Sequence, residues 1–516
     1  MGSNISLLRN KGFRWHEKNG IHIKGYFFLD GKSVSAVEVL QFLYKQKDKK
    51  EFLKKVHEIN GCFSIVAELD DCIIALSDTV RSFPLFYAVK EGEIYISDEA
   101  EELVKATGYK KINQEGLIDY LHCGCVLYNE TLIEGINQVS AMSYMCYNLS
   151  NKDLEYDKYK SIYGAEYSIT NKKDMLKALD TYFHDVAMRL VESLGGRTAV
   201  VALSGGVDSR ACLVMLKMMN YKNVICFTYG GKTSDENEVA KRVAEYLGYR
   251  HIYIPHYRKE WQNTYKDKRS LEYIHYAGNL CAIAHMESHY IVRHLLEKKL
   301  IPEDSIMISG HIGLVASSKF DVCSNPSKAE IKELFWKYWM KLYNYSGKRK
   351  DYYDRRLDKY FPHDGPYSCK EAEIIFENAS FDSVRGKHII NYNRQFELHD
   401  LEWRLPLMDH EFMSGFEKIL PGVRDKKKTV FSKYVMKLSG EDVKPTEFKL
   451  SFFAKAMRNL RNPVYGIITP FRLLFSGKKG CLLPPFPIRQ YRFLRRFYSY
   501  CALQEIKLIE GWLKEL

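Results

Sequence analysis

The sequence predicts an α/β protein in which a parallel sheet with helices on both faces follows a β-rich sandwich domain. Two patterns lead to this prediction. From Asn171 onward, long segments of helical periodicity alternate with short apolar runs, which is typical of a parallel sheet covered on both faces. Before that residue, short apolar runs follow one another closely between turn residues and charges, which suits two packed sheets.

The chain is too long for one ordinary hydrophobic core, because it has 516 residues. Its hydrophobic fraction of 46% is that of a globular protein. A polar stretch at 156–174 separates the two patterns. We therefore expect a first domain over residues 1–160, a second over residues 171–455, and a basic, aromatic-rich appendage over residues 456–516.

Short apolar runs mark the expected strands of both domains. Those of the first domain are CFSIVAEL (62–69), CIIALSD (72–78), PLFYAV (84–89) and EIYISD (93–98). Those of the second domain are TAVVAL (198–203), NVICFTY (223–229), HIYIPH (251–256) and SIMISG (305–310). A helix is expected to start near Thr233, since Thr233 and Glu236 have capping-box spacing, and to end before Gly248.

Composition limits the classes of function. No run of about 18 apolar residues predicts a membrane span, and the N-terminus lacks the apolar core of a secretory signal, so we expect a cytoplasmic protein. The twelve cysteines are irregularly spaced and predict buried free thiols, Cys123 and Cys125 included. Much of the net charge of +13 lies late in the chain. This basic tail could be a solvated subdomain, a peripheral membrane contact or an RNA-binding surface.

One loop carries the clearest chemical signal. Residues 199–216 read AVVALSGGVDSRACLVML, so a buried strand passes into a helix through two glycines, at the edge of the sheet where ligands bind. Gly205 and Gly206 let backbone N–H groups approach an anion, and the helix start adds its positive end. Asp208 would sit beside phosphates only with a cation such as Mg²⁺ between them. The loop therefore predicts a polyphosphate site, but not a Walker loop, because it has no lysine.

SGGVDS at 204–209 resembles the pyrophosphate-binding loop of the ATP pyrophosphatase superfamily, whose members split ATP into AMP and pyrophosphate. Further stretches are similar to asparagine synthetase, namely 227–255, 308–320, 401–421 and 443–453. Residues 59–103 resemble the later half of that family's N-terminal amidotransferase domain. The resemblance implies an adenine nucleotide α-hydrolase-like sheet behind an Ntn-type sandwich.

The resemblance also implies roles for single residues. The residues expected to bind ATP are Leu203, Ser204, Gly205, Gly206, Asp208, Ser209, Thr228, Ser309 and Gly310. Asp208, with Asp235 as a second ligand, would hold Mg²⁺. Lys449 stands where the family has an essential lysine and would stabilise charge on the phosphate. His311 would accept a proton from the attacking amine or, in an equally weighted interpretation, would only hold its own loop. Arg404 and Asp409 are expected to form a buried ion pair around Pro406.

Two departures from the family bear on activity. The glutaminase nucleophile of the family is a cysteine at position 2, where this sequence has Gly2. We therefore expect no glutamine hydrolysis, a first domain that acts as a scaffold or docking surface, and ammonia or an amine supplied from elsewhere. The second departure is Leu314 and Val315, which stand where the family has an acidic pair near Mg²⁺.

Within the family, the sequence is most similar to the asparagine-synthetase-like proteins of surface-polysaccharide gene clusters, which lack the glutaminase cysteine. This similarity implies an AMP-forming carbon–nitrogen ligase that adenylates a carboxylate, with an acidic sugar as the expected substrate. A nucleic-acid partner is not expected. Two other functions stay open: a catalytically degenerate scaffold, which Leu314 and Val315 favour, and a tRNA-modifying ATP pyrophosphatase, which the basic charge favours.

Overall fold

The first domain has four layers, two sheets packed face to face with helices outside each. The computed structural model describes residues 4–161, 166–230, 235–255, 267–311, 319–320, 325–340, 350–425, 427–443 and 491–516. One sheet has the order β1-β8-β7-β9, and the other has the order β11-β10-β6-β5-β3-β2 with β4 paired to β3. The strands are β1 (Asn4–Ser6), β2 (His16–Lys18), β3 (Ile21–Leu29), β4 (Lys32–Val34), β5 (Asn60–Glu68), β6 (Cys72–Ser77), β7 (Phe86–Lys90), β8 (Glu93–Ser97), β9 (Asn137–Gln138), β10 (Ser143–Asn148) and β11 (Leu154–Lys158).

Alternating apolar side chains build the core of this sandwich. Val66, Ile73, Tyr87 and Ile96 lie between the two sheets. The opposite face of the larger sheet packs on α1 (Ala36–Leu43) and α2 (Lys49–His57), and the smaller sheet is covered by α3 (Ala100–Thr107) and α4 (Gln114–Cys123). All four strands expected for this domain are present as β5 to β8, so the prediction of an Ntn-type sandwich is confirmed.

The second domain is built on a five-stranded sheet of order β14-β13-β12-β15-β16, in which every neighbouring pair is parallel. Its strands are β12 (Ala199–Ala202), β13 (Val224–Gly230), β14 (Arg250–Pro255), β15 (Ile306–Ile308) and β16 (Glu402–Arg404). The four expected strands are confirmed as β12 to β15. The edge strand β16 was not predicted, because three residues are too few to set a period.

Helices flank this sheet and extend beyond it. The helices around the sheet are α5 (Lys172–Leu194), α6 (Val207–Met218), α7 (Asp235–Leu247), α9 (Lys268–Gly278) and α10 (Met286–Glu297). The later ones are α11 (Lys328–Phe335), α12 (Lys350–Leu357), α13 (Cys369–Ser380), α14 (Arg394–Leu398), α15 (His410–Glu417), α16 (Thr429–Ser439) and α18 (Tyr491–Glu515). Within the described residues, the segments between them include the π-helices η2 (Trp336–Met340) and η4 (Phe381–Ile389) and the 3₁₀ turns η3 (Asp358–Tyr360), η5 (Ile390–Asn393) and η6 (Pro406–Met408). Among the described residues, no helix is both long and apolar enough to cross a bilayer.

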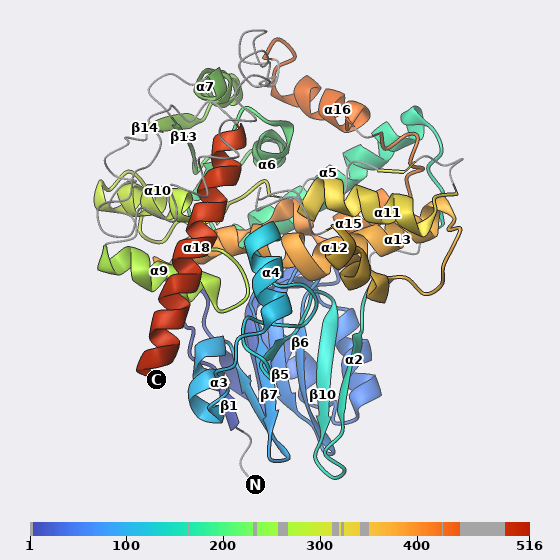
Figure 1. Ribbon diagram of the computed structural model, residues 1–516. Coiled ribbons are helices and arrows are strands. Elements are labelled where there is room, and N and C mark those ends of the chain that lie inside the picture. The colour runs from blue at the N-terminus through green and yellow to red at the C-terminus, as the bar shows by residue number, and fades with distance from the viewer. Residues whose placement is uncertain are drawn as a thin grey trace, which may run out of the picture.

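The two domains share one hydrophobic core. Phe13 and Phe83 of the first domain pack on Trp403 of β16 with ring centroids 5.4 and 5.3 Å apart. Trp403 is fully buried there. The C-terminal helix α18 lies alongside both domains (Figure 1), and its buried Glu505 accepts hydrogen bonds from the Tyr120 hydroxyl in α4 and from the Ala284 N–H.

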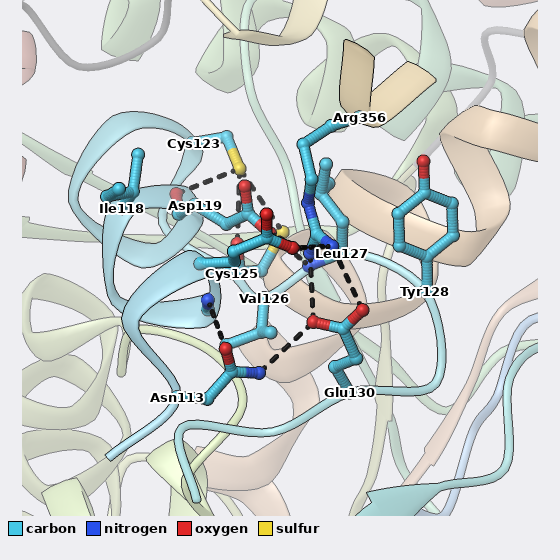
Figure 2. Close-up of polar contacts among 12 residues, drawn as sticks. Asn113, Ile118, Asp119, Cys123, Cys125, Val126, Leu127, Tyr128, Glu130 and Arg356 are labelled. Carbon is cyan, nitrogen blue, oxygen red and sulfur yellow. Dashed lines mark hydrogen bonds and ion pairs between the residues drawn. The ribbon is translucent and has the colours of Figure 1, made fainter. Parts of the chain in front are cut away.

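A buried ionic cluster also crosses the interface. Figure 2 shows Arg356 of α12 turned toward Asp119 of α4 and toward Glu130, at distances of 2.6 and 2.9 Å. The Arg356 side chain is 4% exposed and that of Asp119 is 0% exposed, so this pair is shielded from water. The thiols of Cys123 and Cys125 lie beside it, fully buried and free, as the sequence predicts.

The expected pairing of Arg404 with Asp409 is wrong. Asp409 accepts two hydrogen bonds from Arg189 of α5, both at 2.8 Å. Arg404 instead donates to Glu402 and to the Ser193 carbonyl. Both residues therefore tie the loop around Pro406 to α5, rather than to each other.

Candidate active site at the glycine loop

The glycine loop lies where the central strand β12 ends and α6 begins, with Gly206 as the N-cap residue of α6. The Ser204 N–H donates to the Ser209 hydroxyl at 3.0 Å, and the Gly206 N–H donates to the Ser204 hydroxyl at 3.2 Å. The two hydroxyl groups are 2.9 Å apart. These bonds set the two serine hydroxyls and the loop amides at the positive end of α6, an arrangement suited to the oxygens of an anion.

Asp208, in the first turn of α6, is paired with a residue that the sequence did not single out. The Lys428 ammonium donates to both carboxylate oxygens of Asp208, at 2.9 and 2.8 Å. Lys428 is the N-cap residue of α16, at a φ of 55°. The only local signal was a run of three lysines before a helix, at 426–428, which cannot say which lysine points at the loop.

Glu236 is a second residue that the sequence did not assign to the site. Glu236 lies in the first turn of α7, and its carboxylate accepts a hydrogen bond of 3.3 Å from the Gly205 N–H. Asp235, predicted as a second metal ligand, is exposed at the start of the same helix. The structure thus brings the neighbour of Asp235 to the loop, while the role of Asp235 stays a prediction.

The loop after β15 packs directly on the glycine loop. A Cβ atom on Gly310 would lie 2.6 Å from both the backbone nitrogen and the Cα of Ser209, so only glycine fits. This close approach places Ser309 and His311 beside the start of α6. Ser309 is buried, and its hydroxyl lies 2.7 Å from Nδ1 of His311.

His311 is half-buried at this place. Its ring meets the ring of Tyr392 edge-on, with centroids 4.1 Å apart. Burial, and to a smaller extent the neighbouring His285, lowers the pKa of His311 to about 3. The imidazole is therefore neutral near pH 7, with one N–H and one free lone pair, and the direction of the Ser309 hydrogen bond decides which nitrogen carries the proton. The Ser309 contact fits the loop-holding role predicted for His311, whereas so low a pKa makes the imidazole a weak base for the proton-accepting role.

Leu203 and Thr228 belong to the walls of the site. Leu203 is buried, and its N–H donates to the Phe227 carbonyl at 2.9 Å, which extends the β12–β13 ladder. The Thr228 hydroxyl donates to the Leu203 carbonyl at 2.6 Å and lies 2.9 Å from Nε2 of His251. These bonds hold the ends of the two strands together under the loop. Lys449, Leu314 and Val315 lie outside the described residues.

The residues present fit ATP phosphates and one magnesium ion. The loop supplies N–H and hydroxyl donors, and Asp208 supplies a hard carboxylate beside them. Mg²⁺ typically takes one or two carboxylates and completes its shell with phosphate oxygens and water. Among the described residues, no three His, Cys, Asp or Glu side chains gather in a way that would hold a metal ion without such help.

Two family models match the chain, one in each domain. Residues 26–160 match the model of a glutamine amidotransferase domain, and residues 198–278 match the model of the queuosine biosynthesis protein QueC, which is ATP pyrophosphatase-like. The second match contains the glycine loop. Together the matches indicate an asparagine-synthetase-like architecture and an ATP-dependent, amidotransferase-type enzyme.

Solved structures give weaker similarity. Glutamine phosphoribosylpyrophosphate amidotransferase from B. subtilis, complexed with ADP and GMP, is 8% identical, with a TM-score of 0.19 over 61% of this chain and 65% of that chain. A structure described as the allosteric regulatory enzyme of purine biosynthesis is 7% identical, with a TM-score of 0.19 over 62% of this chain and 57% of that chain. The chain thus spans less than two thirds of each. No curated protein sequence matches it.

Proposed function

We propose that this protein is an ATP-dependent, AMP-forming carbon–nitrogen ligase of asparagine synthetase type. The observation that carries the proposal is the glycine loop at the end of β12, with the Asp208–Lys428 pair beside it and Gly310 packed against it. The match of this segment to an ATP pyrophosphatase-like family, behind an amidotransferase-like domain, supports the same reaction class.

In the first step, a carboxylate oxygen of the substrate attacks the α-phosphorus of ATP, and the bond from that phosphorus to the β-phosphate bridge breaks. The hydroxyls of Ser204 and Ser209 would bind the departing pyrophosphate, together with the amides of Gly205 and Gly206 once these exchange their present acceptors for phosphate oxygens. Bound Mg²⁺, held by Asp208, would supply charge neutralisation. Lys428 would neutralise a further part of the developing charge, because its ammonium already lies at the carboxylate beside the loop.

In the second step, the lone pair of ammonia or an amine attacks the carbonyl carbon, and the bond to AMP breaks. His311 is our candidate to accept the proton released by nitrogen, and it would do so only once the bound phosphates had raised its pKa from about 3, because an effective base has a pKa near the working pH. Lys449 is our candidate to stabilise the tetrahedral intermediate. We expect the nitrogen to come from solution or from another protein.

We place the substrate among acidic sugars, such as hexuronic acids or nucleotide sugars with a carboxylate, in surface-polysaccharide synthesis. This part of the proposal rests on the resemblance noted in the sequence. A peripheral membrane contact of the basic tail would fit a lipid-linked sugar, since cationic aromatic segments bind anionic lipid surfaces.

Pyrophosphate release by the purified full chain tests the proposal. The assay contains ATP, Mg²⁺, ammonium and a panel of uronic acids and nucleotide sugars. Asp208→Ala is the test variant, and Asp304→Ala, which changes an exposed aspartate before β15, is its control. Release that requires a carboxylate and Asp208 would support the ligase. ATP binding without release on any carboxylate would favour a degenerate scaffold.

A further inference from the structure

The Gly205 N–H has an acceptor that comes from outside its own loop. The two neighbouring amides, of Ser204 and Gly206, donate to hydroxyl groups within the loop. Gly205 donates instead to the Glu236 carboxylate, 31 positions later in the sequence, at 3.3 Å. Gly205 is buried and Glu236 is half-buried, so the contact is partly shielded from solvent.

A carboxylate at this amide has the same chemistry as a phosphate oxygen. Both are anionic acceptors, and charge-assisted hydrogen bonds to backbone N–H groups are stronger than neutral ones. One N–H has one hydrogen to donate, and two anions at one place repel each other. A phosphate oxygen can therefore bind the Gly205 amide only if the Glu236 side chain moves away.

Glu236 is also well placed to return to the amide. It stands in the first turn of α7, which is anchored in the core through Ala240, Val243, Ala244 and Leu247. Its carboxylate thus stays close to the loop after it has left Gly205. A tethered group competes with a free ligand as if it were present at high concentration.

Building on the proposed function, we propose that Glu236 is an internal competitor for pyrophosphate. Its carboxylate occupies the Gly205 amide, yields to the phosphates of ATP, and takes the amide back as pyrophosphate leaves. Glu236 is therefore a positioning residue that favours product release, and its charge weakens the binding of free pyrophosphate.

Binding of pyrophosphate alone tests this inference. Isothermal titration calorimetry in buffer containing Mg²⁺ compares the wild-type chain with Glu236→Gln and Glu236→Ala. Glu238→Gln, an exposed glutamate on the same helix, is the control. Loss of the competing charged acceptor should tighten pyrophosphate binding roughly tenfold in both Glu236 variants. The control should bind as the wild type does.

The outcomes separate this inference from the proposed function. If the wild type binds pyrophosphate and both Glu236 variants bind it equally tightly or more weakly, the role of Glu236 is overturned and the ligase proposal still stands. Binding by the Glu236 variants when the wild type binds too weakly to measure would support strong competition. No binding by any of the proteins would overturn both, because the loop would then not be a pyrophosphate site.

Discussion

The ammonium group of Lys428 lies 2.9 and 2.8 Å from the two carboxylate oxygens of Asp208, although 220 positions separate these residues. The pair brings a cation to a glycine loop that has no lysine of its own. It also holds the Asp208 carboxylate in the first turn of α6, directly after the loop.

We predict that Lys428→Met lowers kcat for ATP-dependent pyrophosphate release about 100-fold or more, which is the usual effect of removing one preorganised donor from developing charge. The measurement is steady-state pyrophosphate release with saturating ATP and Mg²⁺. Lys427→Met, an exposed neighbour, is the matched control and should keep wild-type rates. Equal rates for the two variants would show that the Lys428–Asp208 contact has no part in the chemistry.

Gly310→Ala should abolish ATP binding, with little loss of stability in the parts of the protein outside the glycine loop. The new methyl group would lie 2.6 Å from the backbone of Ser209, so the glycine loop would have to shift. Equilibrium binding of ATP is the measurement. Gly422→Ala is the control, because a Cβ there meets nothing within 4 Å. ATP binding retained by Gly310→Ala would mean that the loop tolerates such a shift and is not held to fixed geometry.

Glu505 should make stability fall as pH rises. Burial raises the pKa of Glu505 to about 8, against the lowering effect of its hydrogen bonds from Tyr120 and Ala284. Folding raises the pKa of this carboxyl, so its contribution to the stability of the folded state is fully present below its ordinary pKa of 4.5. That contribution is lost as the pH rises through 8. The contribution is at most about 5 kcal/mol.

Glu505→Gln removes this ionisation, so its Tm should exceed that of the wild type at pH 9 and should differ less at pH 5. Thermal unfolding at both values is the measurement. Glu510→Gln, an exposed position on α18, should follow the wild type. A Tm difference between Glu505→Gln and the wild type that does not change with pH would contradict a buried, neutral Glu505.

Arg356→Met should destabilise the protein by about 3–5 kcal/mol, because it leaves the Asp119 carboxylate buried without its cation. Chemical denaturation measures this, with the exposed neighbour Arg355→Met as the control. Adding Asp119→Asn to Arg356→Met should restore part of the loss, since no buried charge then lacks a partner. A double variant no more stable than Arg356→Met would assign the loss to packing rather than to charge.

The strands and the glycine loop could be predicted because their signals are local. TAVVAL and NVICFTY are apolar runs of strand length between turn residues. SGGVDS is a contiguous motif in which the two glycines by themselves indicate a tight turn. In both domains the structure has strands at all the expected runs. The helices α1 to α4 over the sandwich were not predicted, although Ser35 and Asp48 are cap residues at two of their starts.

The partners of charged residues could not be predicted, because they depend on segments brought together only by the fold. Lys428 reaches Asp208 over 220 positions, and Arg189 reaches Asp409 over the same separation. Sequence proximity suggested Arg404 for Asp409, and this was wrong. Likewise, Asp235 and Glu236 are adjacent letters, and only the direction of α7 decides that Glu236 faces the loop.

The core shared around Trp403 bears on how such a chain can evolve. A gene deletion that removed the first domain would strip Phe13 and Phe83 from a tryptophan that is otherwise sealed from water. The remaining half would expose a wide apolar surface and aggregate. Point mutations can therefore change or remove catalytic residues of the first domain without preventing folding, whereas deletion of the whole domain would prevent it. The fold of the first domain is therefore needed by the second, independently of any reaction that the first domain catalyses.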